Sequence, residues 1–332
     1  MPYDVITVGS ATIDAFADTE SELIKIMTTH SEEDLIAYPV GTKILIKELR
    51  FLTGGGGTNT ACSFARLGLK TGYLGTIGKD HNGGIVLDFL KKEGIDFLGT
   101  RVDKPTGFSV ILDSIEDDRT ILTHKGANDY FSFASVNRRK LRAEWFYFSA
   151  MTGKAFNALC RIASFAEKNG IKIAFNPSSY LAERGKQFLK PVLSRTNLLV
   201  LNREEAQILV GKEDIAHLLE DLRNLIAEDG IVVITDGRKG ADAFDGSHHW
   251  HIDALKVKVK ETTGAGDAFA SSFLAGLIKK NDMEFALKLA VTNSASVVRY
   301  AGAKEKLLKY REALAQMKKT RYRITKKKLK NG

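Results

Sequence analysis

Two kinds of segment alternate along most of the chain. Short runs rich in β-branched and aromatic residues predict strands, and longer runs with apolar residues three or four positions apart predict helices. The predicted strands are 3–9, 70–78, 145–150, 172–177, 197–202 and 230–237, and the helices are 58–68, 83–94, 157–170 and 204–211. Such alternation is typical of a parallel sheet covered by helices. We therefore expect an α/β fold with a doubly wound, mainly parallel central sheet flanked by helices.

Two regions depart from this alternation, at about residues 15–53 and 105–125. Both contain strand-like runs joined by polar turns, such as KILIKELRFLT at 43–53. We expect these runs to leave the main sheet and form a small β-sheet that acts as a lid. The alternative is that they are edge strands of the main sheet. No change in composition marks a linker, so we predict one domain over residues 1–317.

The composition adds a basic C-terminus to this picture. Of the 332 residues 44% are hydrophobic, which is enough for a large core. Part of the net charge of +9 comes from eight Lys and Arg side chains within 318–332. We predict that 318–332 is a solvated basic tail. Nucleic-acid binding by this tail is the alternative from another functional class, and it is disfavoured because charged runs at chain ends are commonly just solvated.

The N-terminal residues and the cysteines predict the compartment. The first residues carry no basic leader, and no apolar run reaches the roughly 20 residues of a membrane span. Cys62 and Cys160 are far apart in the sequence, which disfavours a zinc cluster or a disulfide framework. We expect a cytoplasmic protein without a membrane partner.

The stretch ETTGAGDAF at 261–269 places three small residues before a carboxylate. Gly264, Ala265 and Gly266 leave the backbone uncovered just where a helix is predicted to begin. Backbone N–H groups at a helix N-terminus can face an anion. Asp267 would then lie beside that anion.

A second glycine-rich stretch, TGGGGTNT at 53–60, precedes an amphipathic helix. Ordering each glycine costs roughly 0.5–1 kcal/mol relative to alanine, so the run predicts close backbone approach to a ligand, or a hinge, rather than packing. Asn59 adds amide donors and an acceptor suited to hydroxyl groups. The alternative is a flexible lid connection without ligand contact. The phosphate-loop pattern GxxxxGK[ST] and the dinucleotide pattern GxGxxG after the first strand are both absent.

Asn202 and Glu205 follow the predicted strand 197–202. Their spacing predicts a capping box at the start of the next helix, which would explain them by itself. However, the carboxyl ends of strands are also where open α/β sheets bind ligands. Either side chain could therefore reach a hydrated Mg²⁺, which prefers few carboxylates and several waters.

Two further loops carry weaker signals. Thr235, Gly237 and Gly240 directly follow a strand, and their backbone could pack against a nucleotide, although a glycine hairpin needs no ligand. The run HHWH at 248–251 contains three histidines. We disfavour a metal site there because no cysteine or carboxylate stands at ligand spacing.

Taken in order, these stretches resemble the ribokinase-like (pfkB) carbohydrate kinase family up to about residue 310. ETTGAGDAFASSFLAGL and GGGGTNTACSFARLG are similar to its two signatures, and NREEA, TDGRKG and GSATID are similar to weaker elements. The resemblance implies a ribokinase-like fold with a lid. It also implies ATP- and Mg²⁺-dependent transfer of the γ-phosphoryl group to a hydroxyl of a sugar or sugar-like substrate.

The resemblance also implies the role of the 264–267 segment. The backbone of Gly264, Ala265 and Gly266 would form an anion hole, and Asp267 would be the catalytic base. A free aspartate has a pKa near ~3.9, and the helix end should favour its ionised form. We therefore expect Asp267 to orient the acceptor hydroxyl and take its proton late, as a loose phosphoryl transition state permits.

The remaining roles implied by the resemblance fall into three groups. Substrate hydroxyls would contact Asp14, Gly55, Gly57 and Asn59. The nucleotide would contact Thr235, Gly237, Gly240 and Asn293. Mg²⁺ would be organised through water by Asn202 and Glu205. K⁺ is a disfavoured cofactor, because Glu261 stands where ribokinase has an aspartate.

Two departures from ribokinase leave the acceptor open. Gly56 stands where ribokinase has a lysine, and the segment between Asp14 and Gly54 is longer. A free sugar, a sugar phosphate and a nucleoside all remain candidates. Small lid sheets often pair in this family, and the alternation in KILIKELRFL suits such an interface. We therefore expect a homodimer through the lid.

Overall fold

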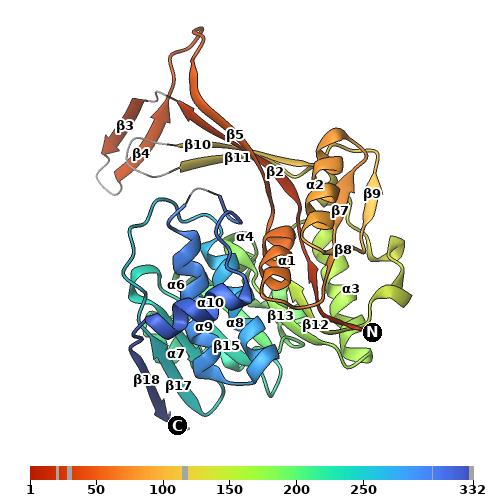
Figure 1. Cartoon of the computed structure of the whole chain (residues 1–332), viewed down its shortest axis with the longest axis vertical. Coiled ribbons are helices and arrows are strands. Elements are labelled where there is room, and N and C mark those ends of the chain that lie inside the picture. Colours follow the sequence, from red (N-terminus) through yellow and green to blue (C-terminus); the bar gives the residue numbers. More distant parts are fainter. Residues whose placement is uncertain (20–21, 28–31, 114–118, 301, 329–332) are drawn as a thin grey trace.

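The computed structural model describes residues 1–19, 22–27, 32–113, 119–300 and 302–328. Within these ranges, ten strands form the central sheet in the order β18-β17-β16-β15-β14-β13-β12-β1-β6-β8 (Figure 1). The predicted α/β fold with a large, mainly parallel sheet is confirmed. The parallel strands are β1 (Tyr3–Val8), β6 (Thr71–Leu74), β8 (Asp96–Phe97), β12 (Ala143–Phe148), β13 (Lys172–Phe175), β14 (Leu198–Asn202) and β15 (Ile231–Thr235). An antiparallel extension consists of β16 (Ala241–Phe244), β17 (His248–Ile252) and β18 (Ile324–Lys328).

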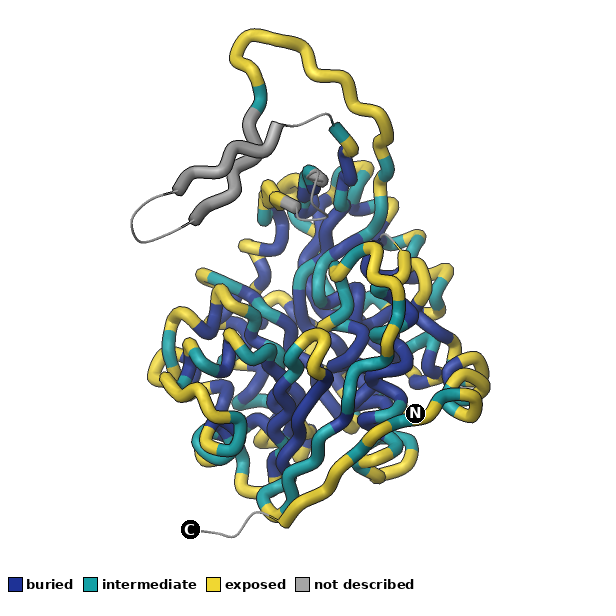
Figure 2. The backbone as a smooth tube through the Cα atoms, turned by 90° about the vertical axis from the view of Figure 1, so that its left-hand side faces the viewer, coloured by how far each residue is buried: buried dark blue, intermediate teal, exposed yellow. Residues whose placement is uncertain are grey.

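Helices cover both faces of this sheet. One face packs against α3 (Lys154–Lys168), α4 (Ser178–Ala182), α5 (Gly185–Leu193), α6 (Arg203–Val210) and α7 (Ile215–Arg223). The other face packs against α1 (Gly56–Arg66), α8 (Ala265–Lys280), α9 (Met283–Val297) and α10 (Tyr310–Lys319). Successive strand residues point to opposite faces, so Val5 enters one core and Ile6 the other. The strands are therefore apolar on both faces, and the tube in Figure 2 is buried through the middle of the body.

A separate sheet forms the lid. Among the described residues it has four strands in the order β11-β10-β2-β5, and it projects from the body in Figure 1. These strands are β2 (Thr12–Thr19), β5 (Ile46–Gly54), β10 (Gly107–Asp113) and β11 (Arg119–His124), and β3 (Glu22–Met27) pairs with β4 (Glu32–Ala37) as a further hairpin. The predicted lid is confirmed, and the alternative of edge strands in the main sheet is wrong.

Shorter elements complete the chain. The predicted strand 70–78 divides at Gly75 into β6 and β7 (Thr76–Gly78), and β7 pairs with β9 (Thr100–Val102) outside the central sheet. Helix α2 (His81–Lys92) packs beside this pair. The 3₁₀ turns are η1 (Gly126–Tyr130), η2 (Phe133–Ser135), η3 (Arg138–Lys140) and η4 (Gly237–Lys239). No helix in the described ranges is long and apolar enough to cross a membrane.

The segment predicted as a basic tail is largely ordered, which corrects that prediction. Strand β18 pairs with β17, with Trp250 opposite Lys326, and the Lys326 ammonium lies 4.4 Å from the centre of the Trp250 ring. Just before it, the Tyr322 hydroxyl hydrogen-bonds to Thr292 in α9 at 2.6 Å. Lysine side chains along an edge strand discourage pairing with other chains while the backbone still joins the sheet. The run of lysines therefore belongs to a sheet edge, and only residues 329–332 lie outside the described part.

Candidate active site

Helix α8 begins at Ala265, two residues before the carboxylate where the helix was expected to start. Its N-cap Gly264 has a left-handed backbone with φ 76°, and a Cβ there would lie 2.4 Å from the Ala303 Cβ. The Ala265 N–H donates to the Thr262 carbonyl at 3.1 Å. Helix geometry leaves the next two N–H groups, of Gly266 and Asp267, without a partner inside the helix. Of the predicted N–H groups, that of Ala265 is therefore used within the protein, whereas that of Gly266, like that of Asp267, has no partner in the helix.

The Asp267 side chain points away from this backbone edge, toward α1. Its Oδ2 accepts a hydrogen bond of 2.8 Å from the Asn59 Nδ2. Burial raises the pKa of the Asp267 carboxyl to about 6, and the Asn59 hydrogen bond and the charge of Lys304 lower it only in part. The pKa therefore lies above that of a free aspartate, contrary to the expectation that the helix end favours the ionised form, because loss of hydration has the larger effect. At neutral pH the carboxylate is ionised and is a stronger base than a free aspartate.

Asn59 provides a second polar atom beside this carboxylate. Its side chain is only 7% exposed, and its Oδ1 is buried with no hydrogen-bond partner among the residues that the structure describes. Buried polar atoms are almost always hydrogen-bonded in native proteins. An acceptor left over next to Asp267 therefore fits the hydroxyl of a bound molecule.

The glycine-rich turn is shaped mainly by contacts within the protein. A Cβ on Gly54 would lie 1.8 Å from the Asp14 Oδ2, and one on Gly55, where φ is 92°, would lie 2.5 Å from the Ser10 carbonyl oxygen. These two glycines are therefore required for packing within the protein, and contact of Gly55 with a substrate stays a prediction. Their small size lets the turn sit tightly against the segment between β1 and β2.

Two other glycines of the turn, both within the first residues of α1, face different ways. The Gly57 N–H donates to the Ser10 carbonyl at 3.1 Å, and its own carbonyl accepts from the Thr7 hydroxyl at 2.9 Å. The Gly57 N–H is thus used within the protein, which disfavours the predicted contact with a substrate. Gly56 faces the site instead, because a Cβ there would lie 3.7 Å from the Asp267 Oδ1.

Asp14 lies at the root of the lid on β2. The Thr12 hydroxyl donates to its Oδ1 at 2.8 Å, and its neighbours across the lid sheet are Leu52 and Ser109. Burial raises the pKa of the Asp14 carboxyl, although Thr12 and the positive charge of Lys304 act in the opposite direction. Its carboxylate therefore stands where the lid, the glycine-rich turn and the body meet.

A cavity of about 300 Å³ lies on the other side of the α8 N-terminus. It contains the predicted nucleotide residues Thr235, Gly237 and Gly240 together with Ala265 and Gly266 of α8. Apolar side chains from the loop after β17 and from α8 and α9 complete its walls: Leu255, Val257, Val259, Phe269, Val291 and Val298. A mostly apolar cleft that ends at uncovered helix N–H groups suits an aromatic ring with an attached phosphate chain.

Asn202 and Glu205 form the predicted capping box of α6. The Glu205 N–H donates to the Asn202 Oδ1 at 2.8 Å, and the Asn202 N–H donates to the Glu205 Oε2 at 3.0 Å. The Ser179 hydroxyl donates to the other Glu205 oxygen at 3.4 Å, and burial raises the pKa of this carboxyl. A carboxylate has about four lone-pair positions, so each oxygen can accept one bond more. The pair therefore fits a water-mediated contact to Mg²⁺ better than direct ligation.

Comparison with known proteins decides the family. The model of the pfkB family carbohydrate kinases matches residues 4–309. The chain belongs to the pfkB family of carbohydrate kinases. It is therefore an ATP-using phosphotransferase with an alcohol group as acceptor.

Individual relatives agree with this family. The kinase is 29% identical over 259 residues to an uncharacterized sugar kinase from Archaeoglobus fulgidus, with 73% of this chain and 97% of that protein covered. The nucleoside kinase of Methanocaldococcus jannaschii aligns with a TM-score of 0.78 at 23% identity and covers 96% of this chain and 99% of that one. Arabidopsis thaliana ribokinase, solved with ribose and ATP, has a TM-score of 0.79 at 21% identity with the same coverage. The two structures show that the fold is ribokinase-like.

One predicted nucleotide residue of the kinase lies elsewhere. Asn293 is fully buried, and its Nδ2 donates to the Ser272 hydroxyl at 2.7 Å while its Oδ1 accepts from the Leu308 N–H at 2.9 Å. This corrects the prediction, because the amide joins α8 and α9 inside the core. The next residue, Ser294, is the one that lines the cavity.

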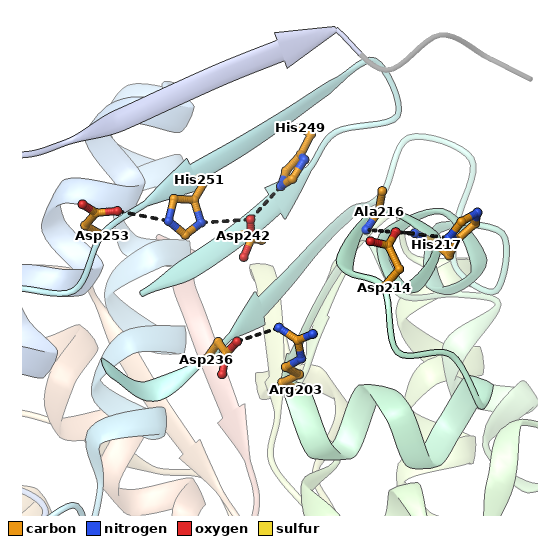
Figure 3. Close-up of polar contacts among 9 residues, drawn as sticks. All are labelled: Arg203, Asp214, Ala216, His217, Asp236, Asp242, His249, His251 and Asp253. Carbon is orange, nitrogen blue, oxygen red and sulfur yellow. Dashed lines mark hydrogen bonds and ion pairs between the residues drawn. The ribbon is translucent and has the colours of Figure 1, made fainter. Parts of the chain in front are cut away.

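Figure 3 shows charged side chains near the loop after β15 that the sequence analysis did not predict. The Arg203 guanidinium donates to the Asp236 carboxylate at 2.8 Å, which ties the start of α6 to the loop after β15. In the same view, Asp242 contacts the imidazole Nε2 of His249 at 2.6 Å and Nδ1 of His251 at 3.0 Å. Sequence spacing missed this carboxylate because it comes from the neighbouring antiparallel strand. Among the described side chains, no group of three or more His, Cys, Asp or Glu is arranged to hold a metal.

A larger hollow of about 980 Å³ lies away from these groups, between η1 and the start of α3. Its walls contain none of the predicted site residues in the described ranges. Size alone therefore does not locate the active site. The residue that sequence reasoning missed most clearly is Lys304, which is buried beside the glycine-rich turn. The sequence offers one weak signal for a functional Lys304, which is that it directly follows Gly302 and Ala303.

Proposed function

We propose that this kinase transfers the γ-phosphoryl group of ATP, with Mg²⁺, to a hydroxyl of a sugar or sugar-like substrate. The single observation that carries the proposal is the first turn of α8. On one side of it Gly266 opens into the cavity, and on the other side Asp267 contacts Asn59 at 2.8 Å. Donor and acceptor would therefore approach each other from opposite sides of one helix end.

The donor side follows from the cavity. The adenine ring would lie among the valine and leucine side chains, and the phosphates would extend toward Gly266. The N–H groups and the positive end of α8 would then stabilise charge on the transferring phosphoryl group. Bound Mg²⁺ would neutralise phosphate charge, with Asn202 and Glu205 holding it through water.

On the acceptor side Asp267 would orient the hydroxyl. The unpartnered Asn59 Oδ1 and the Asp14 carboxylate lie on the same side and would accept hydrogen bonds from other hydroxyls of the substrate. With a pKa near 6, Asp267 is ionised at neutral pH and can take the proton as the O–P bond forms. The lid above Asp14 would exclude water from this reaction.

The acceptor is best sought with a panel. ADP release with ATP and Mg²⁺ is measured over pentoses, hexoses, their phosphates and nucleosides. We expect a sugar to be the best acceptor, with a nucleoside as the alternative. Absence of ADP release with every member would contradict the proposal.

Replacing K⁺ by Na⁺ in the same assay tests the monovalent cation. The Thr263 hydroxyl oxygen is buried without a partner in the described part of the chain, while the nearby Glu261 carboxylate already accepts from the Gly302 N–H at 2.9 Å. An unused oxygen fits a cation, but the engaged carboxylate disfavours one. We expect turnover to be equal in both salts.

The central assignment is tested with Asp267→Ala. Loss of the base should lower turnover by at least ~10²–10⁴-fold while ATP affinity changes little. Glu284→Ala is the matched control, because Glu284 is an acid in the first turn of the neighbouring helix α9. Wild-type turnover of the Asp267 variant would show that this residue is only a helix-end charge.

A further inference from the structure

Lys304 is a buried cation whose hydrogen bonds are all made to neutral groups. Its side chain is only 6% exposed. The ammonium donates to the Thr53 carbonyl at 2.7 Å, to the Thr58 hydroxyl at 2.9 Å and to the Thr53 hydroxyl at 3.3 Å. An ammonium has three N–H donors, and these three contacts use them. Lys304 therefore has no donor left with which to grip a substrate directly.

These contacts join the two ends of the glycine-rich turn. Thr53 belongs to lid strand β5 and Thr58 to the first turn of α1, and the Thr58 hydroxyl donates in turn to the Gly54 carbonyl at 2.6 Å. The residue after Thr58 is Asn59, which holds the Asp267 carboxylate. The lysine thus clamps the backbone from which the acceptor-side groups project, and it does so at the root of the lid.

The charge of Lys304 has no direct ion pair among the described residues. The charged and titratable groups that face it are Asp14 on β2, Asp267 on α8, Cys62 and Arg66 on α1, and the Phe89 ring of α2 lies 4.8 Å from the ammonium. Arg66 is itself paired with Glu93 at 2.6 Å. Burying a cation without a direct partner is unfavourable, so a core alone would favour an apolar residue here. The positive charge of Lys304 lowers the pKa of both acceptor-side carboxylates, Asp14 and Asp267.

We propose that Lys304 is a positioning residue for phosphoryl transfer, which clamps the glycine-rich turn and provides a fixed positive charge behind Asp14 and Asp267. This inference rests on the proposed function for its kinetic part only. Lys304 would thus provide a positive charge on the acceptor side. The glycine-rich turn itself provides none, because Gly56 stands where ribokinase has a lysine.

The charge has a consequence for pH. Lys304 lowers the pKa of Asp267, so its removal should raise that pKa and move the acid limb of the pH–rate profile upward from about 6. Burial in turn lowers the pKa of Lys304 to about 8. Turnover of the wild-type enzyme should therefore also decline above that pH, as the ammonium loses its proton.

The kinetic test compares Lys304→Met and Lys304→Arg with the wild-type enzyme from pH 5 to pH 9.5. ADP release is followed with ATP and D-ribose, or with the best acceptor of the panel if ribose is not used. For Lys304→Met we expect kcat to fall roughly 10–100-fold, as for a small misplacement of reacting groups, and the acid limb to move to higher pH. Lys304→Arg keeps the positive charge, so its acid limb should lie at the same pH as that of the wild-type enzyme.

The matched control is Lys306→Met, which removes an exposed lysine two residues away whose ammonium lies over the Tyr300 ring. It should leave the profile unchanged. Thr58→Val keeps the charge of Lys304 but removes one end of the clamp, so kcat should fall without movement of the acid limb. A Lys304→Met enzyme with the wild-type profile would overturn the proposal, and Thr58→Val tests the clamp if that variant fails to fold.

A stability measurement tests the buried charge without any turnover. Between pH 8 and 10.5 the folded protein has released the Lys304 proton while the unfolded chain still binds it, so wild-type stability should rise with pH relative to Lys304→Met. Below pH 8 both states are protonated, and the difference between the two proteins should be constant. A constant difference up to pH 10 would show that Lys304 is not a buried cation, whatever the acceptor turns out to be.

Discussion

At Asp267 two opposing effects act on one carboxyl group. The N-terminus of α8 and the Asn59 amide favour the charged form, whereas burial disfavours it. Burial has the larger effect, so the pKa of Asp267 rises to about 6. A carboxylate held in this way is more basic but destabilises the folded protein at neutral pH. At neutral pH the folded protein is therefore less stable, but the Asp267 carboxylate binds a proton more tightly.

Asp267→Asn should reveal this loss of stability. The folded state binds the Asp267 proton more tightly than the unfolded chain between pH 3.8 and about 6, so the wild-type carboxyl destabilises the fold above this window. The variant should be more stable than wild type at pH 7.5, by about 3 kcal/mol, and this advantage should largely disappear near pH 4. Thermal melts at both pH values measure it, while ADP release should be lost. Glu284→Gln serves as the control, and an Asp267→Asn protein that is less stable at pH 7.5 would contradict the assignment of a buried charge.

Much of the site was predictable from single residues, because small size and capping leave clear patterns. Thr235, Gly237 and Gly240 line one cavity with the first residues of α8, which fits their predicted nucleotide role, and Asn202 caps α6 as predicted. Lys304 and Asp242 were not predictable, since their partners come from distant segments. Asn293 proved to be a core residue, because a local pattern does not show whether a polar group faces a ligand or the core.

At the level of elements, periodicity predicted strands β1, β6, β12, β13, β14 and β15 and helices α1, α2, α3 and α6, because each has a distinct apolar spacing. Helices α4, α5, α7, α9 and α10 and strands β8, β16 and β17 were not predicted. Their ends were less predictable: α8 starts before its carboxylate, and α1 includes two glycines that sequence reasoning left in the loop. Strand β18 was missed altogether. Its pairing depends on backbone hydrogen bonds that leave no apolar pattern in a run of lysines.

The lid strands carry exposed apolar side chains, and we propose that they mediate a dimer. Leu49 and Phe51 on β5 are 49% and 59% exposed, and Leu122 on β11, which lies on the same face of the lid sheet, is 56% exposed. Such groups on one small sheet favour an interface. Light scattering at micromolar concentration should give a dimer mass for the wild-type protein.

Replacing both Leu49 and Phe51 with serine should convert that dimer to a monomer. Ile208→Ser, which changes an equally exposed apolar residue on α6, should leave the mass unchanged. A monomeric wild-type protein would refute the lid interface.

At the scale of the whole molecule, the proposed function places the two substrates at separate parts of one scaffold. The proposed nucleotide cavity lies among loops at the carboxyl ends of the central strands and against α8, and the proposed acceptor side lies beneath the lid. Residues next to β16 and β17 also line that cavity, whereas strand β18 has no residue in it. We therefore expect β18 to contribute to the stability of the body rather than to the reaction.

Truncation after Arg323 should separate these roles. Removing β18 exposes the edge of β17 and uncovers Trp250, so we expect a loss of roughly 1–3 kcal/mol in the free energy of unfolding. ADP release at 25 °C should persist, because no described residue of the site lies beyond that point. Truncation after Lys328 is the control and should change neither quantity. Loss of turnover without loss of stability would contradict this division.

The stretch between β4 and β5 has a practical consequence. Residues 39–49 are all exposed, and this part of the lid stands far from the body in Figure 2. Exposed backbone of this kind is where proteases cut first and where inserted sequence is tolerated. A single cut or a fluorescent tag placed there would report how the lid moves when a sugar arrives, while the body stays intact.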